Sequence, residues 1–326
     1  MKKILFHSPA LNFRGVTNSI VDFAIFNQSV LGNESAIVYN PEFKIVPDRD
    51  VSSRLPVIDY LKRNFKVLTY TTEKELNKVA EDFDLIYTQD SGLKKRPFVT
   101  STRSCIHAVF QYYEPYGDRY AYISEWLTNT MSGGQCPFVP LIIDFPRDEE
   151  KLATIRKNFR QGLGITDDMF VIGRLGGALT FDLEFVHSAI KKISEQHSNI
   201  RFLLANTYPH VEHPNIIYLN PFFGKDAKSG FIYSCDAMIH GRQLGESFGL
   251  SIGEGLFFDK PVLAWQGGFD RNHIELLKGR DLIYSEENIE SKILSLLDRP
   301  KQSYRQIVAP YSGINVMSKF KSVFVD

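Results

Sequence analysis

Short apolar runs alternate with longer mixed segments along the whole chain. Runs of strand length occur first at 4–6, 36–39, 67–70, 84–88, 98–100 and 121–124, and again at 170–175, 201–205, 216–219, 237–240, 261–265 and 282–284. Helix-length mixtures of polar and apolar residues separate them. Two successive series of this kind predict an α/β protein with two doubly wound sheets.

The first series ends near residues 144–147, where Pro146 follows the last apolar run and a charged helix is expected over 148–160. We therefore expect an N-terminal domain over 1–145 and a second domain over 146–300. Residues 301–326 are expected to form C-terminal helices, the last near 311–324. Ligands of open parallel sheets bind beyond the carboxyl ends of the strands, so the expected site is a cleft between the two domains.

Composition narrows the class of protein. A chain of 326 residues with 43% hydrophobic and 23% charged residues is typical of a soluble globular protein. Lys+Arg and Asp+Glu number 38 each, so no net charge favours nucleic acid or an acidic membrane. The one compact basic run, Lys94-Lys95-Arg96, is interpreted as a solvated loop, with an anionic acceptor or a lipid surface as the alternative.

The number of cysteines and the length of the apolar stretches indicate the cellular compartment in which the protein is expected. The three cysteines, Cys105, Cys136 and Cys235, are too few and too scattered for a disulfide framework or a zinc site. No stretch is long enough for a membrane span or a signal peptide. We expect a soluble cytoplasmic protein, with peripheral membrane contact and a homodimer left open.

Glu246 and Glu254 have seven residues between them in a strand-loop-helix-strand segment. A helix beginning near Ser247 directs its free N–H groups at the preceding loop, which favours a phosphate beside Glu246. At about 1.5 Å per residue, Glu254 lies roughly 10 to 12 Å further along. Gly253 and Gly255 each cost about 1 kcal/mol in a helix, so we expect close approach of a ligand or a neighbouring backbone there. The alternative is an ordinary helix with two solvated acids.

Two further motifs have features of phosphate or metal sites. The loop 173–178 follows a strand, where backbone N–H groups and Arg174 can bind phosphate, or where the chain simply turns. Asp48-Arg49-Asp50 has the spacing of a D-x-D metal site, but it lies in a proline-flanked polar stretch far from the two glutamates. We therefore expect no metal site.

The residues around the two glutamates carry a resemblance to a known family. Glu246-Ser247-Phe248-Gly249-Leu250, then 253–255 and 260–262, resemble the E-x7-E signature of family-4-type retaining glycosyltransferases of the GT-B fold. Segments 122–127, 139–144 and 170–175 also resemble that family. The resemblance implies two Rossmann-like domains facing across a cleft, with the last helix, near 311–324, crossing back onto the first domain. It also implies that a nucleotide-sugar is a substrate, with no further cofactor.

By this resemblance, residues of both domains form the site. The catalytic residues would be Glu246, His107 and Arg174, and the donor-binding residues Glu254, Gly249, Phe248, Leu250, Ser247, Gly15, Gly173, Asn206 and Phe222. His107 and Phe222 have an equal alternative as core residues. The family's usual lysine after the arginine aligns with Leu179-Thr180. Either Arg174 and the helix at Ser247 suffice, or Lys225 or Arg242 substitutes, or transfer is slow.

The predicted function is metal-independent, retaining transfer of a hexose onto a glycan, glycoprotein or lipid-linked hydroxyl. Family frequency favours mannose from GDP-mannose, with glucose from UDP-glucose as the other donor. The alternatives are a pseudo-transferase that binds the nucleotide-sugar with little catalysis, and a sugar-nucleotide epimerase. A dehydrogenase is disfavoured because Ser8-Pro9-Ala10, and not a G-x-G-x-x-G motif, follows the first strand.

Overall fold

The computed structural model describes residues 1–43 and 54–326, and Asp48, Arg49 and Asp50 lie outside them. The chain forms two compact units. The first contains Met1–Ile142 and Tyr311–Asp326, and the second contains Ile143–Pro310. The sequence places the domain boundary near residues 144–147, and the resemblance places the last helix on the first domain.

The first unit contains a parallel sheet of six strands in the order β3-β2-β1-β4-β5-β6. The strands are β1 (Lys3–His7), β2 (Glu34–Tyr39), β3 (Lys66–Thr69), β4 (Leu85–Asp90), β5 (Arg103–Ala108) and β6 (Arg119–Tyr122). The prediction of a strand at 98–100 is wrong, because those residues form a loop that precedes β5. β5 is hidden in the sequence by its polar residues Ser104 and His107, both of which are buried.

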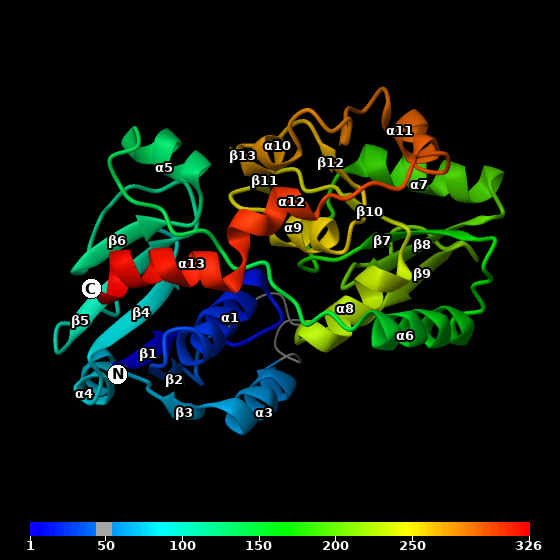
Figure 1. Ribbon diagram of the computed structural model, residues 1–326. Helices are drawn as coiled ribbons and strands as arrows, with labels where there is room; N and C mark the ends of the chain where they lie inside the picture. The colour runs from blue at the N-terminus through cyan, green and yellow to red at the C-terminus, as the bar shows by residue number, and fades with distance from the viewer. Residues whose placement is uncertain (44–53) are drawn as a thin grey trace. The chain divides into compact units, whose positions relative to one another are not determined.

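Helices cover both faces of this sheet. They are α1 (Gly15–Ser29), α3 (Arg54–Asn64), α4 (Glu73–Ala80), α5 (Glu125–Ser132) and α13 (Gly313–Phe320), which continues as the π-helix η2 (Lys321–Val325). On one face, α13 packs beside α1 (Figure 1) so closely that a Cβ added at Gly313 would clash with the ring of Phe26. On the other face, Leu76 of α4 packs in a cluster with Leu5 and Ile86.

The second unit repeats the plan, with strand order β14-β12-β10-β7-β8-β9 and every pair parallel. These strands are β7 (Phe170–Arg174), β8 (Ile200–Ala205), β9 (Ile216–Leu219), β10 (Ala237–His240), β12 (Val262–Trp265) and β14 (Ile283–Tyr284). All six were expected from apolar runs. A separate short ladder joins β11 (Gly245–Glu246) to β13 (Asp270–Arg271).

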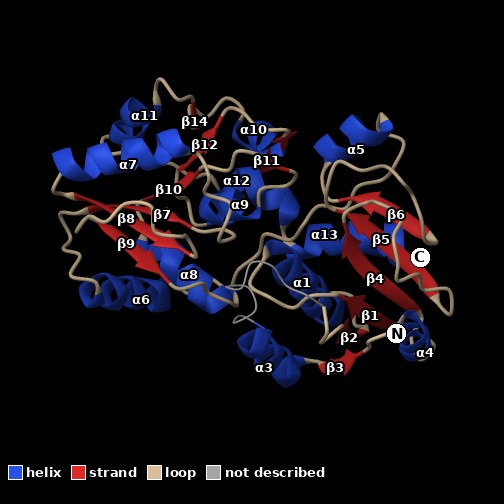
Figure 2. Cartoon of the chain, turned by 180° about the vertical axis from the view of Figure 1, so that it is seen from behind, coloured by secondary structure: helices blue, strands red, loops and turns tan. Residues whose placement is uncertain are grey.

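Helices flank the second sheet on both faces (Figure 2). They are α6 (Glu149–Gly162), α7 (Glu184–Gln196), α8 (Lys225–Ser234), α9 (Leu250–Phe257), α10 (Asn272–Leu277), α11 (Ile289–Ser295) and α12 (Arg305–Val308), followed by the 3-10 turn η1 (Ala309–Tyr311). α6 packs against α8, and α7 packs against α11. None of the described helices is both long enough and apolar enough to cross a membrane.

His107 lies in the core of the first unit. Its side chain is 0% exposed, and its ring contacts those of Phe23 and Phe324. The Nε2 atom lies 2.7 Å from the carbonyl oxygen of Val139, and Nδ1 lies 2.5 Å from the hydroxyl of Tyr87. Both ring nitrogens are therefore satisfied within the core, which favours the interpretation of His107 as a core histidine over contact with a donor sugar.

Burial lowers the pKa of His107 to about 4. A histidine whose folded pKa lies below its unfolded value binds its proton more readily in the unfolded chain, so stability is lost as the pH falls from about 6.5 towards about 4. We expect the urea midpoint to fall across this range, and His107→Phe to show a weaker dependence than the wild type. An equally steep dependence in the variant would contradict the assignment.

Candidate functional site

The strand order of the second sheet reverses between β7 and β10. β7 lies between β8 and β10, so the connections on its two sides run in opposite directions. Arg174 ends β7 and His240 ends β10. In open parallel sheets, ligands bind outside the carboxyl ends of the strands at such a switch point. Both residues are therefore at the edge where a ligand is expected.

Glu246 lies against His240. Its carboxylate accepts a hydrogen bond from His240 Nε2 at 2.9 Å and lies 3.4 Å from Nη1 of Arg242. The backbone N–H of Glu246 donates to Nδ1 of His273 at 3.3 Å. These four side chains form a cluster, which we call the Glu246 cluster.

Gly245 determines where Glu246 lies. Its φ is 74°, a conformation that side chains rarely adopt, and a Cβ there would lie 1.9 Å from the carbonyl oxygen of Asp270. This close approach pairs β11 with β13. The hydroxyl of Tyr284 donates to the carbonyl of His240 at 2.7 Å, which fixes the other end of the loop. Backbone packing from three segments therefore positions the carboxylate.

The cluster keeps Glu246 ionised. Burial acts to raise its pKa, but the hydrogen bond from His240 and the charge of Arg242 outweigh burial and lower the pKa to about 2. His240 Nδ1 is buried and has no hydrogen-bond partner among the described residues. A buried nitrogen without a partner costs roughly 1–3 kcal/mol, and in a native structure it is explained by strain, by a functional role or by a bound water or ion.

Arg174 forms hydrogen bonds with other groups of the protein. Its side chain is 2% exposed, and burial lowers its pKa to about 9, so it remains charged at neutral pH. It donates hydrogen bonds of 2.8 to 3.1 Å to the carbonyls of Gly177, Ala205 and Asn206 and to the hydroxyls of Thr207 and Thr180. Arg174 thus joins the loop after β7 to the end of β8, and its contact with a phosphate stays a prediction.

The neighbouring donor-binding predictions have local structural roles. Asn206 adopts a left-handed φ of 49°, and its amide donates to the carbonyl of Gly176 at 3.0 Å. Gly173 is inside β7, where a Cβ would lie 2.4 Å from Sγ of Cys235, so packing explains this glycine. The ring of Phe222 packs 5.3 Å from that of Phe231.

α9 begins at Leu250, and the expected start near Ser247 is wrong. Gly249 precedes the helix with a φ of 95°, a left-handed conformation that ends the loop and delays the helix. Ser247 and Phe248 are buried in this loop, and the Phe248 carbonyl accepts from Asn272 at 2.7 Å. The free N–H groups therefore belong to the first turn from Leu250.

Packing within the second unit accounts for the two glycines beside Glu254. A Cβ at Gly253 would lie 2.1 Å from Cδ1 of Ile143, and one at Gly255 would lie 2.6 Å from Cγ2 of Val262. Close approach occurs, but the expectation of a ligand or a neighbouring backbone as the partner is wrong. The partners are apolar side chains, and neither a ligand nor backbone is needed to explain the glycines.

Glu254 forms an ion pair that the sequence did not indicate. Its Oε1 accepts a hydrogen bond from Nζ of Lys228 on α8 at 2.7 Å, and the two side chains are 8% and 12% exposed. The second carboxylate oxygen takes no hydrogen bond from the described residues. Lys228 was missed because it precedes Glu254 by 26 residues, in a helix start that reads as solvated.

Of the two expected substitutes for the family's lysine, only Arg242 belongs to the Glu246 cluster. Nζ of Lys225 bonds the carbonyl of Asp144 and lies 5.3 Å over the ring of Phe145. Leu179 is 58% exposed. Gly15 is the first residue of α1 in the first unit, where it is exposed. No group of metal-ligating residues occurs within 1–43 and 54–326.

Solved structures match the chain over nearly its whole length. The glycosyltransferase HepE of Anabaena, in complex with UDP and glucose, has a TM-score of 0.73 and 12% identity, with 99% of each chain covered. A glycosyltransferase of Rickettsia africae has a TM-score of 0.68 and 12% identity, covering 100% of this chain and 99% of the other. A putative UDP-N-acetylglucosamine 2-epimerase of Listeria monocytogenes has a TM-score of 0.59 and 14% identity, covering 99% and 96%.

No family model matches the chain, and its sequence matches no curated protein. The structural likeness, with two parallel six-stranded sheets, shows that the chain has the GT-B glycosyltransferase fold expected from the sequence. Membership of family 4 and the functional meaning of the Glu246 and Glu254 spacing stay predictions, because a likeness at this identity is one of fold.

Proposed function

We propose that this protein is a glycosyltransferase whose second unit binds a nucleotide-diphospho-sugar. The observation that carries the proposal is the ionised carboxylate of Glu246, held by His240 and Arg242 at the switch point of a GT-B donor-type sheet. A partly buried charged pair at the edge where ligands bind is more costly than a fully solvated pair, which favours a functional role.

The chemistry follows from the charges in the cluster. Arg242 and the N–H groups of the first turn of α9 would stabilise the departing diphosphate, and Glu246 would orient the donor sugar. The oxygen of Glu254 that Lys228 leaves open would accept a ribose hydroxyl. In the retaining reaction that the resemblance implies, the departing phosphate takes the proton of the acceptor hydroxyl, so no separate carboxylate base is required.

UDP-glucose is the donor that we propose to test first. The sequence favoured GDP-mannose by family frequency alone, whereas HepE, a structure of the same fold, is known in complex with UDP-glucose. Calorimetric titration in EDTA with UDP-glucose, UDP-N-acetylglucosamine, GDP-mannose and the free nucleotides separates these donors. Saturable binding of one sugar nucleotide supports the proposal. Binding of none of them would contradict it.

An epimerase is the second candidate, because a putative UDP-N-acetylglucosamine 2-epimerase has the same fold. An epimerase converts its sugar nucleotide without an acceptor, whereas a transferase releases the nucleoside diphosphate. Incubation with UDP-N-acetylglucosamine alone, followed by chromatography of the products, distinguishes the two. A new sugar nucleotide without free UDP would replace the transferase assignment.

Arg242→Gln is expected to weaken UDP binding at least about tenfold, because a charge-assisted contact to a phosphate contributes about 1.5–3 kcal/mol. The control is Lys157→Gln, which removes one positive charge from the exposed face of α6. Calorimetric titration with UDP measures both. Equal affinities for the two variants would exclude Arg242 as the phosphate contact.

A further inference from the structure

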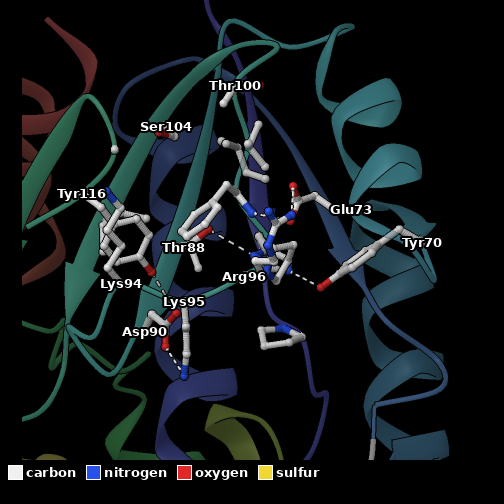
Figure 3. Close-up of a pocket in the computed structure, with 18 of the residues that line it drawn as sticks. Tyr70, Glu73, Thr88, Asp90, Lys94, Lys95, Arg96, Thr100, Ser104 and Tyr116 are labelled. Atoms are coloured by element: carbon white, nitrogen blue, oxygen red, sulfur yellow. Dashed lines mark hydrogen bonds and ion pairs between the residues drawn. The ribbon is translucent and has the colours of Figure 1, made fainter. Parts of the chain in front are cut away.

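The first unit has a cavity of about 850 Å³ beside its sheet. The connection from β4 to β5, residues 91–102, forms no helix, although parallel strands are usually joined by one. This loop, β1 and β4 contribute walls of the cavity (Figure 3). The volume is within the range of small-molecule sites, about 300–1,000 Å³.

A neutral hydrogen-bonding chain forms one wall. The hydroxyl of Tyr70 lies 2.7 Å from Nε2 of His7, and the hydroxyl of Thr88 lies 3.1 Å from Nδ1. Burial lowers the pKa of His7 to about 4, so the imidazole is neutral at neutral pH. Such groups both donate and accept hydrogen bonds, as sugar hydroxyls do.

Charged pairs lie on both sides of the cavity (Figure 3). Asp90 pairs with Lys95 at 2.7 Å and accepts a hydrogen bond from the Tyr116 hydroxyl at 2.9 Å. On the other side, Arg96 pairs with Glu73 at 2.8 Å. These two acids are thus each matched by a cation of the loop.

Lys94 is the remaining cation of the loop. Its ammonium group pairs with no acid among the described residues, while its backbone N–H donates to Glu114 at 2.9 Å. A third acid in the lining, Asp118, accepts the backbone N–H of Ser104 at 2.7 Å. The basic run is the exposed loop expected from the sequence, and it also lines this cavity and leaves one cation for an incoming anion.

Aromatic faces complete the lining. The ring of Phe98 meets that of Tyr116 edge to face at 6.1 Å, and the guanidinium of Arg96 lies 5.6 Å over Phe98. We propose that this cavity binds an anionic sugar, a pyranose with one phosphate or carboxylate group, with its acid on Lys94 and its hydroxyls on Asp90, Tyr116 and Tyr70. This site belongs to the first unit and does not depend on the proposed donor site.

The test is calorimetric titration of the full chain with glucose 6-phosphate, glucuronate, glucose and inorganic phosphate. We expect at least one of the two anionic sugars to bind at least about tenfold more tightly than glucose and than inorganic phosphate. The acid group of the sugar that binds more tightly, phosphate or carboxylate, identifies the chemical class of the natural ligand. Binding of neither anionic sugar, or equal binding of inorganic phosphate, would overturn the proposal.

Variants locate the binding. Lys94→Gln is expected to weaken the anionic sugar about tenfold and to leave glucose unchanged, whereas Tyr116→Phe should weaken both. Lys62→Gln, on the exposed side of α3, is the control and should bind as the wild type does. Arg242→Gln should also retain the anionic sugar. If Arg242→Gln abolishes binding or Lys94→Gln has no effect, the ligand occupies another site and the proposal fails.

Discussion

Glu246→Gln is expected to lower kcat/KM by about 100-fold or more, while the Kd for UDP changes by less than about threefold. The carboxylate is ionised, with a pKa near 2, and glutamine keeps its shape without its charge. The loss falls on turnover because the carboxylate is proposed to orient the sugar and to balance Arg242. Steady-state kinetics with the donor found by titration measures kcat/KM, and calorimetry with UDP measures the Kd.

The matched control is Glu195→Gln on the exposed side of α7, which removes one negative charge from the same unit and should leave the kinetics unchanged. Circular dichroism establishes that both variants are folded. If Glu246→Gln keeps full turnover while folded, the carboxylate has no part in the reaction. If UDP binding falls as far as turnover, Glu246 acts in donor binding and not in orienting the sugar.

The second sheet was predictable because its strands are buried on both faces. Parallel strands between two layers of helices form continuous apolar runs, and each run of the second series corresponds to one strand. β5 of the first sheet was not predicted because it contains His107, whose ring nitrogens form hydrogen bonds with Tyr87 and Val139. Partners so distant in sequence leave no local pattern, so a buried polar strand looks like a loop.

The candidate site was predictable in its position but not in its contacts. Glu246 was identified from its spacing and its place after a strand, which local sequence contains. The acceptors that surround Arg174 come from the loop after β7 and from the end of β8 with the residues that follow it, and their meeting depends on the folded sheet. For the same reason, the sequence indicated a free arginine where the structure has one whose Nη1 and Nη2 atoms both donate hydrogen bonds within the protein. Hydrogen-bond satisfaction is a tertiary property, whereas charge and glycine spacing can be read locally.

Separating Glu254 from Lys228 is expected to cost about 3–5 kcal/mol in the free energy of unfolding, because either single change leaves one nearly buried charge unpaired. The variants are Lys228→Met, Glu254→Gln and the double variant. The double variant should be more stable than the sum of the single losses predicts, since it removes both charges. Urea denaturation of all four proteins gives the coupling energy.

The exposed pair Lys191 and Glu195 on α7 is the matched control, with 4.0 Å between the charged atoms and an expected coupling of about 0.3–0.5 kcal/mol. An equally small coupling for Lys228 and Glu254 would mean that the pair is solvated.

UDP titration of the same variants distinguishes a structural role of Glu254 from a role in nucleotide binding. If Glu254 accepts a ribose hydroxyl, the folded double variant should bind UDP more weakly than the wild type. The methionine and the amide restore packing, but they do not replace the carboxylate. Unchanged UDP affinity would confine Glu254 to a structural role in joining α9 to α8.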